Sequence, residues 1–151
     1  MALGMLQRKV WEEWPIGSKR TILLVEDNKT DVDLVKRALL DGPLVPALIV
    51  AEDGVEALNV IRGGLRPDLI LLDLNLPRKS GHQVISELKE HPEYRRIPIV
   101  VLTSSRADRD VFGAYQGHAN CYVTKPMDID EFSNMLHSLQ EFWLLHATLP
   151  S

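Results

Sequence analysis

The chain has 151 residues, of which 45% are hydrophobic and 25% charged, a balance typical of one ordinary globular domain. Its formal net charge is −4 with no long basic run, which argues against nucleic acid as a partner, and no apolar run approaches the roughly 18 residues of a membrane span. Cys121 is the only cysteine, which excludes an internal disulfide, and the N-terminus lacks the apolar core of a secretory signal, so we expect a cytoplasmic protein.

The first segment expected along the chain is an N-terminal arm over residues 1–20. Leu3, Leu6, Val10 and Trp14 recur at helical spacing there, so we expect the arm to pack against the rest of the protein. The remaining residues, 21–151, are expected to form one domain that ends in an extended helix.

After the arm, short apolar runs alternate with amphipathic segments of helix length, a pattern typical of βαβ units and a parallel sheet. The expected strands are Thr21–Val25, Ala47–Val50, Asp68–Asp73, Ile97–Leu102 and Cys121–Thr124. The expected helices are Thr30–Leu40, Val55–Arg62, His82–Glu90, Arg106–Gln116 and Asp128–Leu145. The sequence therefore predicts an α/β domain with an open five-stranded sheet.

Strongly polar side chains stand at the ends of four of these strands. Glu26 and Asp27 follow the first, Asp73 ends the third, Thr103 follows the fourth and Lys125 follows the fifth. An aspartate is rarely buried without a partner, because removing its charge from water is costly. In open α/β sheets, functional groups gather at the carboxyl ends of the strands. We therefore expect either a satisfied structural acid or a reactive site at Asp73.

If the first and third strands are neighbours, Glu26, Asp27 and Asp73 converge on one small volume. Three like charges in contact destabilise one another unless a cation is bound, and a hard divalent ion such as Mg²⁺ prefers oxygen ligands. Lys125 and the Thr103 hydroxyl would then face an anionic group. A phosphoryl group fits that description, since aspartate carboxylates are known to form aspartyl-phosphates.

Four motifs in order carry a family resemblance. They are VEDN at 25–28, LLDLNLP at 71–77 followed by Gly81, VLTSS at 101–105 and YVTKP at 122–126. With these motifs, the chain resembles the receiver domain of two-component response regulators over about Thr21 to Leu139. The resemblance implies a doubly wound, flavodoxin-like fold with strand order 2-1-3-4-5 and helices on both faces.

The resemblance also implies a role for each acid. Asp73 would be the phosphate acceptor and Asp27 a direct ligand of Mg²⁺, with Glu26 acting through water. The backbone carbonyl of Asn75 would be a further metal ligand. Such a protein is not a separate enzyme: it is a phosphoacceptor that catalyses its own phosphotransfer and dephosphorylation.

The same resemblance assigns the remaining motif residues. Lys125 would pair with one phosphoryl oxygen and Thr103 would donate its hydroxyl to another. Tyr122 would reorient when Thr103 moves. A cis peptide bond between Lys125 and Pro126 is also expected from the resemblance, because that turn would aim the lysine at the phosphate.

The last helix carries an apolar stripe broader than one side of a sheet requires. We expect it to form a symmetric dimer interface through Ile129, Phe132, Leu136, Leu139, Phe142 and Trp143. The tail FWLLHATLP, with NLPRKSG and NCYVTKP, resembles single-domain regulators that partner cyanobacterial phytochromes. That finer resemblance implies a phytochrome-type sensor histidine kinase as phosphodonor and a homodimer as the active form.

The chain ends at Ser151, soon after this helix, so we expect no DNA-binding output domain. The output would be a protein contact or onward transfer to a phosphotransfer protein. One alternative function stays open, a constitutive protein-binding module with a receiver fold that phosphorylation does not regulate. Phosphotransfer to Asp73 distinguishes the two.

Overall fold

A parallel sheet of five strands forms the middle layer of the structure, a computed structural model that describes residues 20–42, 45–104 and 107–146. The strands are β1 (Thr21–Val25), β2 (Ala47–Ala51), β3 (Leu69–Leu72), β4 (Ile99–Thr103) and β5 (Cys121–Thr124). Their order, β2-β1-β3-β4-β5, confirms the predicted fold class. The arm expected over residues 1–20 lies, apart from Arg20, outside the described residues.

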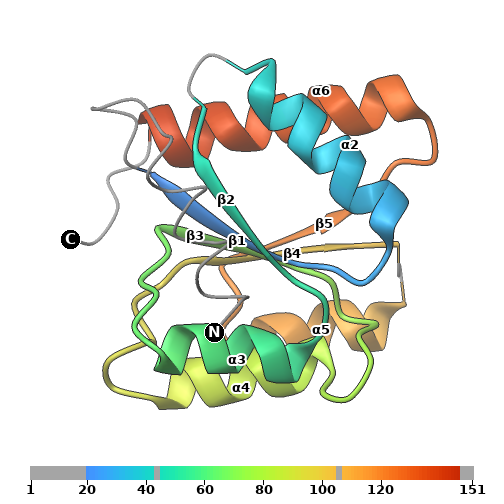
Figure 1. Cartoon of the computed structure of the whole chain (residues 1–151). Helices are drawn as coiled ribbons and strands as arrows, with labels where there is room; N and C mark the ends of the chain where they lie inside the picture. The colour runs from blue at the N-terminus through green and yellow to red at the C-terminus, as the bar shows by residue number, and fades with distance from the viewer. Residues whose placement is uncertain (1–19, 43–44, 105–106, 147–151) are drawn as a thin grey trace.

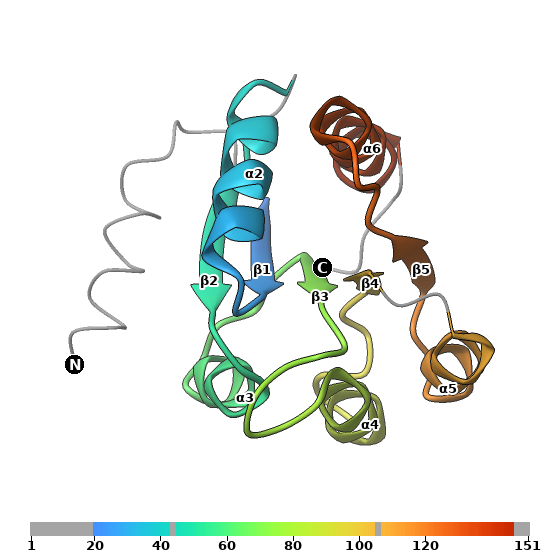
Figure 2. The ribbon, with the colours of Figure 1, turned by 90° about the vertical axis from the view of Figure 1, so that its right-hand side faces the viewer.

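Helices cover both faces of this sheet, with α2 and α6 on one side and α3, α4 and α5 on the other (Figure 1). Their bounds are α2 (Lys29–Leu40), α3 (Gly54–Arg62), α4 (Gly81–Glu90), α5 (Asp108–Gln116) and α6 (Ile129–Gln140), which continues into a π-helical segment, η1 (Glu141–His146). The view along the sheet in Figure 2 shows the same three layers. Within the described ranges, none of these helices is long and apolar enough to cross a bilayer.

Each strand divides its side chains between two hydrophobic clusters, one on each face. In β1, Leu23 and Val25 belong to the cluster under α3 and α4, whereas Ile22 and Leu24 belong to the cluster under α2 and α6. All four residues of β3 are buried. Strands of a parallel sheet covered on both faces must be apolar throughout, and this requirement explains the continuous apolar run before Asp73.

Polar caps fix where the helices begin at the carboxyl edge of the sheet. Asn28, Asp53, Ser80 and Asp128 each accept a backbone N–H from the first turn of α2, α3, α4 and α6, respectively. Such caps satisfy N–H groups that a helix start leaves unpaired. The predicted start of the last helix at Asp128 is confirmed. Its end differs, because the regular helix stops at Gln140 and π-helical geometry follows.

The expected interface stripe on the last helix is divided by the fold. Phe132 and Leu136 are only 3% and 1% exposed, packed in the cluster beneath α2 and α6. Leu139 and Trp143 are half-buried against the same cluster. Ile129 and Phe142 remain 62% and 56% exposed. The assignment of Phe132 and Leu136 to an interface is therefore wrong, because the helix needs these side chains to cover the sheet.

Alanine substitutions of two phenylalanines on this helix test the division. Phe132→Ala should lower the free energy of unfolding by about 3–5 kcal/mol, because it leaves a cavity in the core. Phe142→Ala should cost less than about 1 kcal/mol, because its ring is largely in solvent. Urea unfolding of both variants at low protein concentration measures the difference. Equal losses would contradict the assignment of Phe132 to the core.

Candidate functional site

Three carboxylates meet where β1 and β3 end. The register pairs Val25 with Leu72, so the residues that follow them, Glu26 and Asp73, emerge side by side. One carboxylate oxygen from each of Glu26, Asp27 and Asp73 lies within 4.8 Å of the others. Glu26 and Asp73 are buried, whereas Asp27 is exposed at the mouth of the site. The predicted convergence of these acids is therefore present in the fold.

A single lysine enters this acidic cluster from β5. The backbone N–H of Lys125 donates to the Thr103 carbonyl at 2.8 Å, which continues the pairing of β4 with β5. Its ammonium group contacts the carboxylates of Glu26, Asp31, at 2.9 Å, and Asp73, at 3.2 Å. An ammonium group has three hydrogens to donate, so these three acids can occupy all of them.

Asp73 is held by donors on both carboxylate oxygens. Its Oδ1 accepts from the Thr103 hydroxyl at 2.7 Å and from the Asn75 backbone N–H at 3.2 Å. Its Oδ2 accepts from Lys125. Thr103 is fully buried at the end of β4, so its hydroxyl lies on the inner side of the site. These contacts fix the orientation of the carboxylate relative to β4 and β5.

The site carries more carboxylates than its one ammonium group can neutralise. Burial raises the pKa of Glu26 to about 7, and the neighbouring Asp73 adds to this effect although Lys125 opposes it. Burial by itself lowers the pKa of Lys125, but hydrogen bonds to Asp31 and Glu26 outweigh it and raise the pKa above its usual range. Lys125 therefore stays charged, and the cluster offers an all-oxygen donor set. Such a set fits a hard divalent cation.

Two further predicted residues lie beside this centre. Asn75 follows Asp73 by two residues and contacts it through the backbone, so its carbonyl as a metal ligand stays a prediction. Tyr122 packs against the cluster under α3 and α4, and its backbone N–H donates to the Tyr115 hydroxyl at 3.1 Å. Its reorientation also stays a prediction.

The expected cis bond between Lys125 and Pro126 is wrong, because the peptide bond is trans. The trans isomer is the lower-energy form of most bonds that precede proline. The Lys125 side chain reaches all three carboxylates with this isomer.

Sequence reasoning missed Asp31, which lies in the first turn of α2 and contacts Lys125. The sequence contains only a weak signal for this role of Asp31. Acidic residues are common in the first turn of any helix, where they interact favourably with its dipole. Only the reach of the Lys125 side chain across the site to the start of α2 distinguishes this aspartate from an ordinary helix-start acid.

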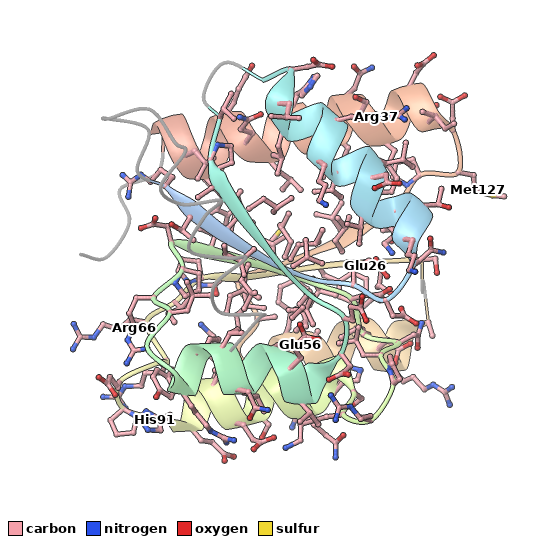
Figure 3. All side chains as sticks on the ribbon, viewed as in Figure 1. Glu26, Arg37, Glu56, Arg66, His91 and Met127 are labelled. Carbon is pink, nitrogen blue, oxygen red and sulfur yellow. The ribbon has the colours of Figure 1, made fainter. Side chains whose placement is uncertain are left out.

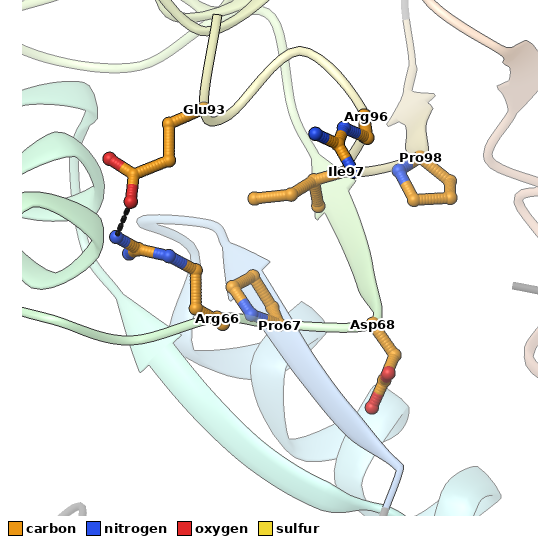
Figure 4. A pocket seen from close by; sticks show the side chains of 7 residues that line it. All are labelled: Arg66, Pro67, Asp68, Glu93, Arg96, Ile97 and Pro98. Carbon is orange, nitrogen blue, oxygen red and sulfur yellow. Dashed lines mark hydrogen bonds and ion pairs between the residues drawn. The ribbon is translucent and has the colours of Figure 1, made fainter. Parts of the chain in front are cut away.

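A second polar pocket lies at the opposite edge of the sheet, before β3 and β4 begin (Figure 4). Both of its acidic side chains have partners there. Glu93 pairs with Arg66 at 3.2 Å, and Asp68 pairs with Arg20 at 3.5 Å and accepts the Thr21 N–H at 2.8 Å. These contacts fasten loops to the sheet, so the pocket does not compete with the acidic cluster as a reactive centre.

Comparison with known proteins decides the family. The model of the response regulator receiver domain matches residues 22–137. The chain belongs to the response regulator receiver-domain family. Receiver domains are phosphoacceptors, so this chain is a component of phosphorylation-based two-component signalling.

Individual relatives agree with this assignment. The chain is 41% identical over 138 residues to the response regulator Rcp1 of Synechocystis sp., covering 87% of this chain and 94% of that protein. The crystal structure of phosphorylated RcpA, a cyanobacterial phytochrome response regulator, superposes with a TM-score of 0.85 at 42% identity, over 88% of this chain and 99% of RcpA. The Mn²⁺-bound form of Rcp1 gives a TM-score of 0.83 at 41% identity, over 87% of this chain and 99% of Rcp1.

Cation binding should be visible in the thermal stability. A ligand present at one hundred times its dissociation constant stabilises a protein by about 2.7 kcal/mol, so MgCl₂ should raise the melting temperature of the parent. Asp27→Asn should abolish this rise, because it removes one of the three clustered carboxylates. Asp130→Asn is the matched control, since Asp130 is an exposed acid of α6 outside the cluster. An equal rise in the parent and Asp27→Asn would contradict a site at these acids.

Proposed function

We propose that Asp73 accepts a phosphoryl group from a sensor histidine kinase in a Mg²⁺-dependent reaction. The observation that carries the proposal is the position of one buried carboxylate between a hydroxyl donor and a charged lysine, beside two further acids. The acids account for a cation, and the lysine and hydroxyl account for an anionic reactant. Together these groups suit phosphoryl transfer, in which positioning and charge neutralisation supply most of the catalysis.

The transfer can be written in terms of the groups present. An Asp73 carboxylate oxygen attacks phosphorus, an O–P bond forms, and the P–N bond to the kinase histidine breaks. The electron pair of that bond stays on the imidazole. Asp27 and Asp73 would hold Mg²⁺ directly, with Glu26 acting through water and Asn75 through its carbonyl; the bound ion would neutralise the phosphoryl oxygens.

Lys125 and Thr103 have to change partners when the phosphoryl group arrives. The Thr103 hydroxyl now donates to Asp73, and it would turn to a phosphoryl oxygen instead. Lys125 would pair with another phosphoryl oxygen. The movement of Thr103 leaves space beneath β4 into which Tyr122 turns, and this couples Asp73 to the surface of β5. Water attacking the same phosphorus in line returns Asp73, so the protein would catalyse its own dephosphorylation.

A phytochrome-type histidine kinase is the proposed donor. The similarity to Rcp1 and RcpA supports it, since RcpA is a cyanobacterial phytochrome response regulator. We place the protein in the cytoplasm, with residues 1–20 as an arm and 21–151 as the receiver domain. Its output is a protein contact, either with its own copy or with a downstream phosphotransfer protein.

A constitutive binding module with the same fold is the alternative function. Such a module would have no use for a buried hydroxyl and a lysine that both donate to one aspartate. Apolar side chains at these positions would serve its fold equally well. The meeting of three acids, a hydroxyl and a lysine at one centre favours phosphorylation.

Phosphotransfer from purified histidine kinases tests this function. Kinases of the phytochrome type, assayed in both light states, should label the parent in the presence of Mg²⁺. Asp73→Asn should lose the label entirely, because an amide cannot form the acyl phosphate. Chelator should reduce labelling to background. Mass spectrometry that finds phosphate on another residue, or labelling that persists in chelator, would contradict the proposal and favour the constitutive module.

A symmetric homodimer is the proposed form in which the signal is read. Exposed apolar side chains stand at both ends of the last helix. Met127, labelled in Figure 3, and Ile129 are 99% and 62% exposed where α6 begins, and Phe142 in η1 is 56% exposed. Leu139 and Trp143 line a pocket of about 520 Å³ beside Phe142. A two-fold interface must be self-complementary, and an apolar surface that meets its own copy satisfies this. These residues replace the broader stripe that includes Phe132 and Leu136.

Sedimentation of the unmodified and phosphorylated forms tests the dimer. Phosphorylation should tighten self-association by about 5- to 150-fold, the usual range for coupled sites. Phe142→Ala should weaken the dimer by about 2 kcal/mol, since a central aromatic side chain dominates such interfaces. Leu40→Ala is the control, because Leu40 is equally exposed but lies on α2. A protein that is monomeric in both states would contradict the homodimer.

A further inference from the structure

The loop of residues 74–80 joins Asp73 to α4 and carries Asn75. It turns tightly, because the Gly81 backbone N–H donates back to the Leu74 carbonyl at 3.0 Å. A Cβ atom on Gly81 would lie 2.4 Å from the Asp73 carbonyl oxygen, so the start of α4 touches the backbone of the acceptor itself. The shape of this loop therefore decides where Asn75 and Asp73 lie relative to each other.

Arg78, in this loop, has an unusual backbone conformation. Its φ of 64° lies in the left-handed region. A residue other than glycine pays about 1–2 kcal/mol for this geometry. Both Nε and Nη2 of its guanidinium lie 2.8 Å from Oδ2 of Asp53. The two contacts converge on one oxygen and tie the loop to the start of α3.

The two carboxylate oxygens of Asp53 have different partners. Its Oδ1 accepts the Glu56 N–H at 2.8 Å and so caps α3, which leaves Oδ2 for Arg78. Burial by itself raises the pKa of this carboxyl, but the Glu56 hydrogen bond and Arg78 outweigh it and the pKa is lowered. The next residue, Gly54, approaches the loop so closely that a Cβ would lie 2.3 Å from the Lys79 carbonyl oxygen. The start of α3 and the loop are therefore in contact at two consecutive residues.

We propose that Arg78 is a positioning residue of the cation site: its ion pair with Asp53 holds residues 74–80 against α3 and keeps Asn75 in place beside Asp73. The inference rests on the proposed function, in which the Asn75 carbonyl and Asp73 bind the cation. Arg78 does not touch the cation or the phosphoryl group. It acts through the backbone of the loop, and Asp53 is its anchor on the opposite element.

Simple charge effects and positioning predict opposite results for one variant. Arg78→Gln removes a positive charge, so charge alone would tighten Mg²⁺ binding. Loss of positioning should weaken Mg²⁺ binding instead, by roughly 3- to 10-fold, which is less than the roughly 10- to 100-fold usual for side chains that hydrogen-bond a metal ligand, because Arg78 acts through the loop backbone. Asp53→Asn should weaken it to a similar extent while keeping α3 capped, since asparagine is as good a cap as aspartate.

The experiment is an NMR titration of the parent and variants with MgCl₂, following the backbone amides of Asp73 and Asn75. Arg20→Gln is the control, because Arg20 forms a part-exposed ion pair with Asp68 at the opposite edge of the sheet, away from the loop. Its dissociation constant should stay within about twofold of the parent, as expected for an exposed ion pair. Urea unfolding confirms that each variant folds.

The double variant Arg78→Gln with Asp53→Asn completes the test. Because both changes break one contact, it should bind Mg²⁺ no more weakly than either single variant, whereas independent effects would multiply. Tighter binding by Arg78→Gln, multiplied effects, or an equal loss in Arg20→Gln would overturn the role of Arg78 while leaving the cation site intact. A parent that binds no Mg²⁺ at Asp73 would overturn the proposed function and this inference together.

Discussion

The contact of Lys125 with three carboxylates is the interaction on which the rest of the structure depends. Buried like charges repel one another strongly, so Glu26 and Asp73 can share one edge of the sheet only if a cation accompanies them. Lys125 supplies that charge from β5, and the parallel pairing of β4 with β5 delivers it there. Because the ammonium group does not neutralise every acid, the cluster is a suitable donor set for a further cation.

The same contact suits a site with two states. In the structure, the Thr103 hydroxyl and the Lys125 ammonium group both donate to Asp73 itself. A phosphoryl group would extend beyond the carboxylate and draw both donors outward. Since Thr103 ends β4 and Lys125 follows β5, such a rearrangement would be felt at the β5 edge of the sheet. The exposed Met127 and Ile129 follow β5 directly in the chain.

The last helix shows why an apolar stripe alone does not locate an interface. Its sequence presents one continuous apolar face, yet packing assigns Phe132 and Leu136 to the core and leaves Ile129 and Phe142 in solvent. An apolar side chain can pack equally well in a core or against a partner protein. Which side chains of α6 stay exposed depends on the rotation of the helix about its own axis, and the contact of α6 with α2 and the sheet sets that rotation.

The sequence by itself determined the strands and helices along the chain and the acids that follow the strands. The spacing of apolar and polar residues differs between strands, helices and loops, so it indicates each element locally. It also predicted that Glu26, Asp27 and Asp73 converge if the first and third strands are neighbours, since parallel strands end at one edge. Tertiary structure alone decided the partners: Asp31 beside Lys125 and Asp53 beside Arg78. These contacts join residues far apart in the chain, and their distances depend on how helices pack onto the sheet, which no local pattern specifies.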